Sequence, residues 1–257
     1  MKRSTSQGQS AARGSLAAKN PALLSEHAYQ RIREEILFFR LRPGARASES
    51  FLTQQYDLRQ AAVRSALPRL IQEGLIIRTD ERAAFVAPLT LKDVREIYEM
   101  RLLLEPRAAE LAAENGLSAT QIQLLRRVSQ ARYELSNDAE VVQFLRANRD
   151  FNLTMTAASG NSRLTATIAH LQDLTLRILY VGSRSVNFSD WFQRTHEEVI
   201  DVITAGNGDR ARELWTADLK YAERVVSDAI VKLPELSHIN LGDLYLDGAS
   251  GTTRLPA

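Results

Sequence analysis

The sequence contains no cysteine, which excludes disulfide bridges and cysteine-ligated metals. It has no run of about 18 apolar residues, so no membrane-spanning helix is expected. Its N-terminus has no apolar core of the kind that marks secretory signals. The contents of 44% hydrophobic and 25% charged residues are ordinary for a globular protein. We therefore expect a cytoplasmic protein that does not bind membranes.

One internal stretch lacks acidic residues altogether. From Leu58 to Gln72 there are three arginines, at positions 59, 64 and 69, and no Asp or Glu. Apolar residues recur there every three or four positions, which predicts a helix with one buried face. The arginines of such a helix either pair with acids elsewhere in the protein or face a polyanion.

The charge of the whole chain is unevenly divided. Residues 1–88 hold 14 Lys and Arg against 8 Asp and Glu, a net charge of +6. Residues 89–257 hold 19 against 23, a net charge of −4. This asymmetry indicates that only the first part of the chain meets a polyanion such as nucleic acid.

The pattern of the first part predicts a small DNA-binding domain. A Ser-, Gly- and Gln-rich basic stretch at 1–22 is expected to be a flexible tail. Helical periods and turn signals then predict helices at about 25–42, 48–56 and 58–73, and strands at 75–78 and 84–87. Three helices and a β-hairpin over residues 23–88 are typical of a winged helix-turn-helix domain, whose third helix lies in the DNA major groove.

The pattern of the second part is almost entirely helical. Helices are predicted at about 91–114, 118–135, 138–158, 161–181, 189–205 and 208–232. Residues 234–257 are expected to be a loose C-terminal tail. The predicted fold class is therefore mainly α, with an N-terminal winged helix-turn-helix domain and a C-terminal all-α bundle of about six helices over residues 89–233.

Seven short segments carry a resemblance to a known family. The first region contains Leu41-Arg42-Pro43-Gly44, Ser48-Glu49, Val63-Arg64-Ser65-Ala66-Leu67 and Glu73-Gly74-Leu75-Ile76. The second contains Arg101-Leu102-Leu103-Leu104-Glu105, Ala157-Ala158-Ser159-Gly160-Asn161 and His196-Glu197-Glu198-Val199-Ile200. The first set resembles the DNA-binding domain of GntR-family transcription regulators, and the second resembles the helical ligand-binding (FCD) domain of the FadR subfamily. The resemblance covers about residues 24–232.

The resemblance implies which residues bind DNA. Arg59, Gln60 and Arg64 match base- and phosphate-contacting positions of the recognition helix. Gln60 stands where the family commonly has Arg, and Gln prefers adenine edges to guanine edges. Ala83 replaces the usual wing glycine, and Pro68 is expected to kink the helix mildly. The predicted DNA-binding residues are Arg59, Gln60, Arg64, Ser48, Ser50, Arg69 and Arg82.

The resemblance also implies positions for a divalent metal. The subfamily often uses an Asp, a His four residues later and two further His, and these positions are Asn148, Asn152, His196 and Asp218 here. Amide side chains are poor zinc ligands. No metal cofactor is therefore expected, and a weak, oxygen-rich divalent-cation site is the alternative.

Two interpretations of these polar residues stay open. They bond one another in a closed core, or they bind a small organic effector, with carboxylates among the candidates. Arg101 matches a family position that supplies a cation to the effector, and its alternative is an ion pair with Glu105. The predicted effector-binding residues are Arg101, Asn148, Asn152, His196, Asp218, Arg177 and Tyr180.

The predicted function is that of a homodimeric repressor, released from a palindromic operator in double-stranded DNA by a small organic metabolite. A metal-dependent sensor of the same family is the alternative. An enzyme is a remote alternative, because no Ser-His-Asp arrangement and no phosphate-binding loop is found. Glu197, next to His196, is the one obvious acid-base partner, but adjacent helical residues point about 100° apart.

Overall fold

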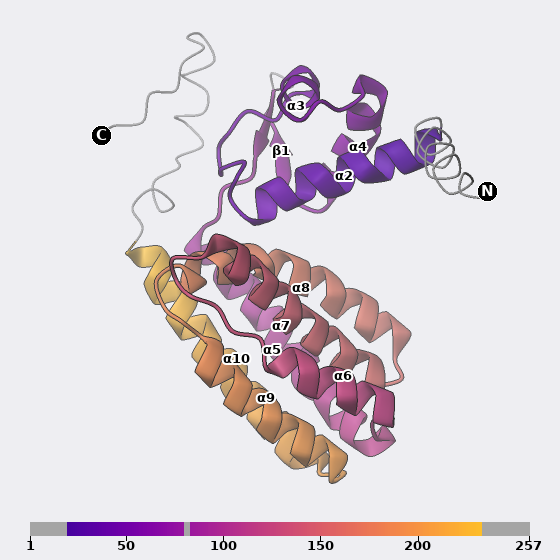
Figure 1. Ribbon diagram of the computed structural model, residues 1–257, viewed down its shortest axis with the longest axis vertical. Coiled ribbons are helices and arrows are strands. Elements are labelled where there is room, and N and C mark those ends of the chain that lie inside the picture. Colours follow the sequence, from indigo (N-terminus) through magenta and orange to yellow (C-terminus); the bar gives the residue numbers. More distant parts are fainter. Residues whose placement is uncertain (1–19, 80–82, 233–257) are drawn as a thin grey trace, which may run out of the picture. The chain divides into compact units, whose positions relative to one another are not determined.

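The computed structural model describes residues 20–79 and 83–232. It divides into two compact units between Pro88 and Leu89 (Figure 1). The predicted C-terminal tail and residues 1–19 of the predicted N-terminal tail lie outside the described residues. In the described ranges, no helix combines the length and the apolar character that crossing a membrane requires.

The first unit contains three helices followed by a hairpin. The helices are α2 (Pro21–Leu37), α3 (Glu49–Tyr56) and α4 (Gln60–Gln72). Strands β1 (Ile76–Arg78) and β2 (Ala84–Val86) pair antiparallel, with Ile77 opposite Phe85. This order confirms the predicted winged helix-turn-helix.

The first helix begins four residues earlier than predicted. Asn20 caps it, because its side chain accepts a hydrogen bond from the backbone N–H of Ala22 at 3.0 Å. Pro21 occupies the first turn, where its missing N–H costs no helical hydrogen bond. The prediction of a flexible tail is therefore wrong for residues 20–22.

Helix α4 has one buried face and one exposed face. Val63 and Leu70 on the buried face are inaccessible to solvent, as are Ile32 and Ile36 of α2, which packs against α4. The helix continues through Pro68, whose side chain lies on the exposed face. The buried face thus holds α4 in place while its opposite face stays accessible.

The second unit contains the six predicted helices. They are α5 (Leu91–Asn115), α6 (Ala119–Ser129), α7 (Asp138–Ala158), α8 (Ser162–Ser183), α9 (Ser189–Thr204) and α10 (Gly208–Val231). Helix α5 is central: it packs most extensively against α10 and also contacts α7, α8 and α9. A capping box between Thr90 and Asp93 starts α5, as the sequence predicts.

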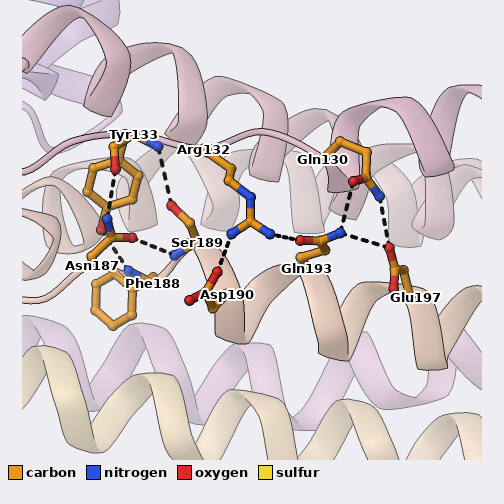
Figure 2. Close-up of polar contacts among 9 residues, drawn as sticks. All are labelled: Gln130, Arg132, Tyr133, Asn187, Phe188, Ser189, Asp190, Gln193 and Glu197. Carbon is orange, nitrogen blue, oxygen red and sulfur yellow. Dashed lines mark hydrogen bonds and ion pairs between the residues drawn. The ribbon is translucent and has the colours of Figure 1, made fainter.

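Helix α6 is shorter than predicted. It ends at Ser129 instead of continuing to residue 135. The residues that follow cross to the start of α9, where Tyr133 is held on several sides (Figure 2). Its N–H donates to Ser189 Oγ at 3.3 Å, its hydroxyl accepts from the Phe188 N–H at 2.8 Å, and its carbonyl accepts from Asn187 Nδ2 at 2.7 Å. These tertiary hydrogen bonds replace the helical ones that the sequence pattern predicts.

A second set of polar contacts continues along α9 (Figure 2). Arg132 bonds both Asp190 and Gln193. Gln193 Nε2 donates to Gln130 at 2.8 Å and to Glu197 at 3.1 Å. The segment that connects α6 to α7 is thus hydrogen-bonded to α9 over two helical turns. Glu197 belongs to this surface network.

Candidate functional site

The N-terminal end of α4 presents the predicted recognition residues. Arg59 occupies the N-cap position, and Gln60 is the first helical residue. Both side chains are exposed, as is that of Arg64 one turn further on. Residues at the start of a recognition helix are the ones that reach base edges in the major groove.

Arg64 is held by an acid from the neighbouring helix. Its Nε donates to Glu49 Oε2 at 3.0 Å, and its Nη2 donates to Glu49 Oε1 at 2.8 Å. The Arg64 hydrogen bond lowers the pKa of Glu49. The Arg64 side chain is still 69% exposed. Pairing with an acid and facing DNA are therefore compatible for Arg64, because an exposed ion pair contributes only about 0–1 kcal/mol.

Arg69 is engaged more completely within the unit. Its guanidinium carbon lies 3.4 Å from the ring centroid of Tyr29 on α2. Its Nη1 donates to Glu26 at 2.9 Å, and its Nε donates to Glu73 at 3.4 Å. The Tyr29 hydroxyl also donates to Glu73 at 2.7 Å. These contacts favour a packing role for Arg69 between α2 and α4.

The two predicted serines lie at the start of α3. Ser48 caps this helix by accepting a hydrogen bond from the Phe51 N–H at 3.3 Å. The Ser48 and Ser50 hydroxyl oxygens are 3.3 Å apart. Helix N-termini attract anions such as phosphate, so this position suits a DNA-backbone contact. Arg82 lies outside the described residues.

In the second unit, a buried carboxylate joins three helices. Glu105 on α5 is 1% exposed and accepts from Arg101 Nε at 2.8 Å and from Arg101 Nη2 at 3.3 Å. It also accepts from Gln172 Nε2 on α8 at 2.8 Å and from Trp215 Nε1 on α10 at 3.0 Å. Four hydrogen bonds saturate a carboxylate. Burial opposes the charge of Arg101, but Glu105, Tyr98 and Asp218 together outweigh it and raise the pKa of Arg101.

Sequence reasoning treated Glu105 only as a partner for Arg101, and it missed the roles of Gln172 and Trp215. The sequence does contain one signal for this cluster: Glu105 follows Arg101 by one helical turn, on the buried face of the helix. The ion pair with Glu105, which is the alternative interpretation of Arg101, is present in the structure.

Only some of the predicted polar residues join this network. Asn152 of α7 donates from Nδ2 to Gln172 Oε1 at 3.0 Å, which connects it to Glu105. Asn148 is buried one turn earlier on α7. Gln172 thus links Asn152 to the cluster that Arg101 forms with Glu105.

His196 is held by its ring faces. It stacks on Phe151 with centroids 3.7 Å apart and rings within 6° of parallel, and on Phe192 at 5.5 Å. Burial lowers the pKa of His196 to about 3. The imidazole is therefore neutral at physiological pH, and its packing is that of an aromatic residue.

Two buried polar atoms beside Arg101 lack hydrogen bonds. Within the described residues, neither the Tyr98 hydroxyl nor Asp218 Oδ1 has a partner. Both groups interact electrostatically with Arg101, and the Tyr98 hydroxyl has in addition a weaker polar interaction with Arg101 that does not reach hydrogen-bond geometry. Burial raises the pKa of Asp218 to about 7, with Arg101 opposing the shift and Glu105 adding to it. Tyr98, which is fully buried, was not singled out by sequence reasoning.

Arg177 and Tyr180 belong to other parts of the unit. Burial lowers the pKa of Arg177 to about 10, and Asp93 opposes this shift. The Tyr180 hydroxyl donates to Asp138 at 2.5 Å. These interactions place the two residues near the starts of α5 and α7 and not beside Glu105.

The four family metal positions do not fit a transition metal here. The Asn152 amide donates a hydrogen bond to Gln172, and the His196 ring stacks with the phenyl rings of Phe151 and Phe192. Over residues 20–79 and 83–232, no group of three or more His, Cys, Asp or Glu side chains is placed to hold a metal ion. Neutral amides do not replace the missing anionic and imidazole ligands.

Comparisons with known proteins match both units. A family model described as bacterial regulatory proteins, gntR family, matches residues 24–86. The FCD domain model matches residues 96–221. Each unit of the structure is thus similar to one family domain.

Individual proteins show the same order of domains. The uncharacterized HTH-type transcriptional regulator YdhC of Bacillus subtilis is 26% identical over 188 residues, 72% of this chain and 83% of YdhC. The HTH-type transcriptional repressor RspR of Escherichia coli is 21% identical over 197 residues, 77% of this chain and 86% of RspR. The structure of E. coli McbR/YncC is similar with a TM-score of 0.66 and 22% identity, over 80% of this chain and 97% of that one. This last likeness concerns the fold.

Proposed function

We propose that this chain, which belongs to the GntR family of bacterial transcription regulators, is a repressor that a small organic metabolite releases from its operator. The proposal follows from its domain order, in which an FCD effector-binding domain comes after the DNA-binding domain. The chain is a regulator and not an enzyme. One relative, RspR, is named a repressor, which supports this direction of control.

The observation that carries the DNA-binding proposal is the acid-free exposed face of α4. Arg59, Gln60 and Arg64 lie together at its N-terminal end, where a recognition helix reads bases. Arg64 suits a guanine edge or a phosphate, and Gln60 suits an adenine edge. We propose a homodimer on a palindromic operator, because twofold proteins bind paired half-sites, and we place its action in the cytoplasm with the DNA.

The observation that carries the effector proposal is the polar cluster around Glu105. A closed core would satisfy its buried polar atoms, since such atoms are bonded in the great majority of cases. The unpartnered Tyr98 hydroxyl and Asp218 Oδ1 favour a bound molecule instead. Its binding must differ between the DNA-bound and released forms, because a ligand with equal affinity for both shifts nothing.

We propose that no metal cofactor takes part. The site that the family would use contains two amides, and one of them already bonds Gln172. The metal-dependent sensor has no observation in its favour among the described residues.

Footprinting on the DNA upstream of its own gene tests this function. Full-length protein is expected to protect two related half-sites, and one class of metabolite is expected to abolish the protection. The Arg64→Ala variant serves as a control that should protect poorly. Protection that no metabolite changes would contradict the effector role, and absence of protection would contradict autoregulation through that DNA.

A further inference from the structure

Resting on the proposed effector role, we propose that the site takes an organic cation, a small amine whose ammonium group binds Asp218 and Tyr98, and not a carboxylate. The proposal names the chemical class of the effector. It follows from the charges, the unpartnered atoms and the aromatic side chains of the cluster.

The charges of the cluster disfavour an anion. Its cation Arg101 pairs through two nitrogens with Glu105. Asp218 adds a second carboxyl group on α10. A ligand carboxylate would place a third carboxyl group beside one guanidinium, and buried charges are costly unless each is paired. An ammonium group would instead give Asp218 Oδ1 the hydrogen bond that it lacks among the described residues.

The unpartnered atoms match what an ammonium group offers. Tyr98 lies on α5 and Asp218 on α10, the two helices that pack most extensively in this unit (Figure 1). Both Asp218 Oδ1 and the Tyr98 hydroxyl can accept hydrogen bonds, and an ammonium group has three donors and no acceptor. Glu105 cannot serve the ligand, because its two oxygens already accept four bonds.

The neighbouring aromatic rings also suit a cation. The guanidinium of Arg101 lies 4.8 Å from the centroid of the Tyr98 ring. Trp215 is one helical turn before Asp218 on α10, and its ring is 6.3 Å from that of Phe151. Aromatic faces attract ammonium groups through the ring quadrupole. The Tyr98 ring, which already contacts one cation, and the Trp215 ring, one turn before Asp218, therefore suit an amine better than an acid.

Three probes with one carbon frame test the proposal: benzylammonium, benzoate and benzyl alcohol. Their binding to the full chain is measured by calorimetry and by thermal shift. Benzylammonium should bind and raise Tm, whereas benzoate and benzyl alcohol should not. Asp218→Asn should weaken benzylammonium binding by about tenfold or more, because the amide keeps an acceptor oxygen but loses the negative charge that strengthens the hydrogen bond to the ammonium group. Asp209→Asn is the matched control, since Asp209 is an exposed acid on the same helix.

Tyr98→Phe gives a second variant that keeps the ring and removes the hydroxyl. It should weaken benzylammonium binding while circular dichroism shows an intact fold. The proposal is overturned by preferential binding of benzoate, by equal benzylammonium affinity of Asp218→Asn and the unmodified protein, or by binding of none of the probes.

Operator binding, measured with the same probes, separates this proposal from the proposed function. Asp218-dependent benzylammonium binding that leaves operator affinity unchanged would support the cation site and contradict its role in DNA release. Release of the operator by benzoate, without benzylammonium binding, would support effector control and overturn the cation site.

Discussion

Arg64 and Arg101 show how the surroundings of an arginine decide its use. Each is held through two nitrogens by one glutamate. The Arg64 side chain is 69% exposed, whereas that of Arg101 is 5% exposed. Breaking an exposed pair costs about 0–1 kcal/mol, but removing one partner of a buried pair costs about 3–5 kcal/mol. Arg64 can therefore leave Glu49 for a DNA group, while Arg101 stays with Glu105.

Replacing Arg64 by alanine is expected to weaken operator binding without loss of stability. The removed contact should cost about 1–3 kcal/mol per half-site if Arg64 reads a base. Fluorescence anisotropy at physiological salt measures the affinity, and thermal unfolding checks the fold. Arg163→Ala, which removes an exposed arginine from the helical unit, is the control. Equal affinities of the two variants would remove Arg64 from the interface.

His196 is expected to make stability depend on pH. Its pKa in the folded protein is lowered to about 3 by burial, from an ordinary value of 6.5. Between these values the unfolded chain binds a proton that the folded chain does not. The stabilisation that the neutral His196 gives the folded protein is thus fully present above about pH 6.5. As the pH falls toward 3, the free energy of unfolding decreases by at most about 1.4 kcal/mol per pH unit through this group.

Urea unfolding between pH 7 and pH 4 measures this effect. His196→Phe keeps an aromatic ring beside Phe151, so its free energy of unfolding should fall less on acidification than that of the unmodified protein. Contributions of other groups, including Asp218, are common to both proteins and cancel in the comparison. The exposed His170→Gln variant should behave like the unmodified protein, and parallel curves for all three would refute the prediction.

At the scale of an element, α7 keeps the four-residue spacing of the implied metal ligands but has amides at both positions. Asn148 and Asn152 are one turn apart, so both side chains face the same side of the helix. Helix α8 supplies Gln172 to the second of them. The Asn152 amide thus joins a hydrogen-bond network at one of the positions where the resemblance implies a metal ligand.

Restoring ligands on α7 is expected to create affinity for zinc. The unmodified protein, purified without added metal, should contain no stoichiometric zinc by atomic emission. The double variant Asn148→Asp with Asn152→His should gain zinc binding, because His196 and Asp218 then complete four ligands. The gain should be partial, since His196 must leave its stacking on Phe151. Tightly bound zinc in the unmodified protein would overturn the argument from the amides.

At the scale of the whole molecule, the two units differ in charge as they differ in role. Residues 1–88 carry a net charge of +6 and residues 89–257 a net charge of −4. Only the first part has the sign of charge that favours contact with the DNA backbone. The small net charge of +2 conceals this division.

Operator binding is expected to weaken steeply with salt. A dimer that neutralises about 6–10 phosphates should lose roughly 10³–10⁵ in affinity between 50 and 200 mM salt, because condensed counterions are released on binding. Anisotropy titrations over this range measure the slope. Arg64→Ala should have a shallower slope than Arg163→Ala, and a flat response of the unmodified protein would exclude a phosphate-dominated interface.

Local signals in the sequence determined the fold class, the order of the helices and most of their ends. Capping residues such as Thr90 and Ser118 act within one turn, so their effect is readable from neighbours in the chain. The exposed face of α4 is equally local, because helical periodicity alone separates Arg64 from Val63. The residues proposed to meet DNA can therefore be predicted from the sequence.

Tertiary structure decided the contacts that join distant segments. Glu105 bonds Gln172 and Trp215, which lie 67 and 110 residues further along the chain, and no short-range pattern records such partners. The end of α6 depends in the same way on the α8–α9 connection, which bonds Tyr133. Whether a buried polar atom is satisfied is a property of packing, because it depends on every element around it. Only the structure could therefore show that the Tyr98 hydroxyl and Asp218 Oδ1 have no hydrogen-bond partner among the described residues.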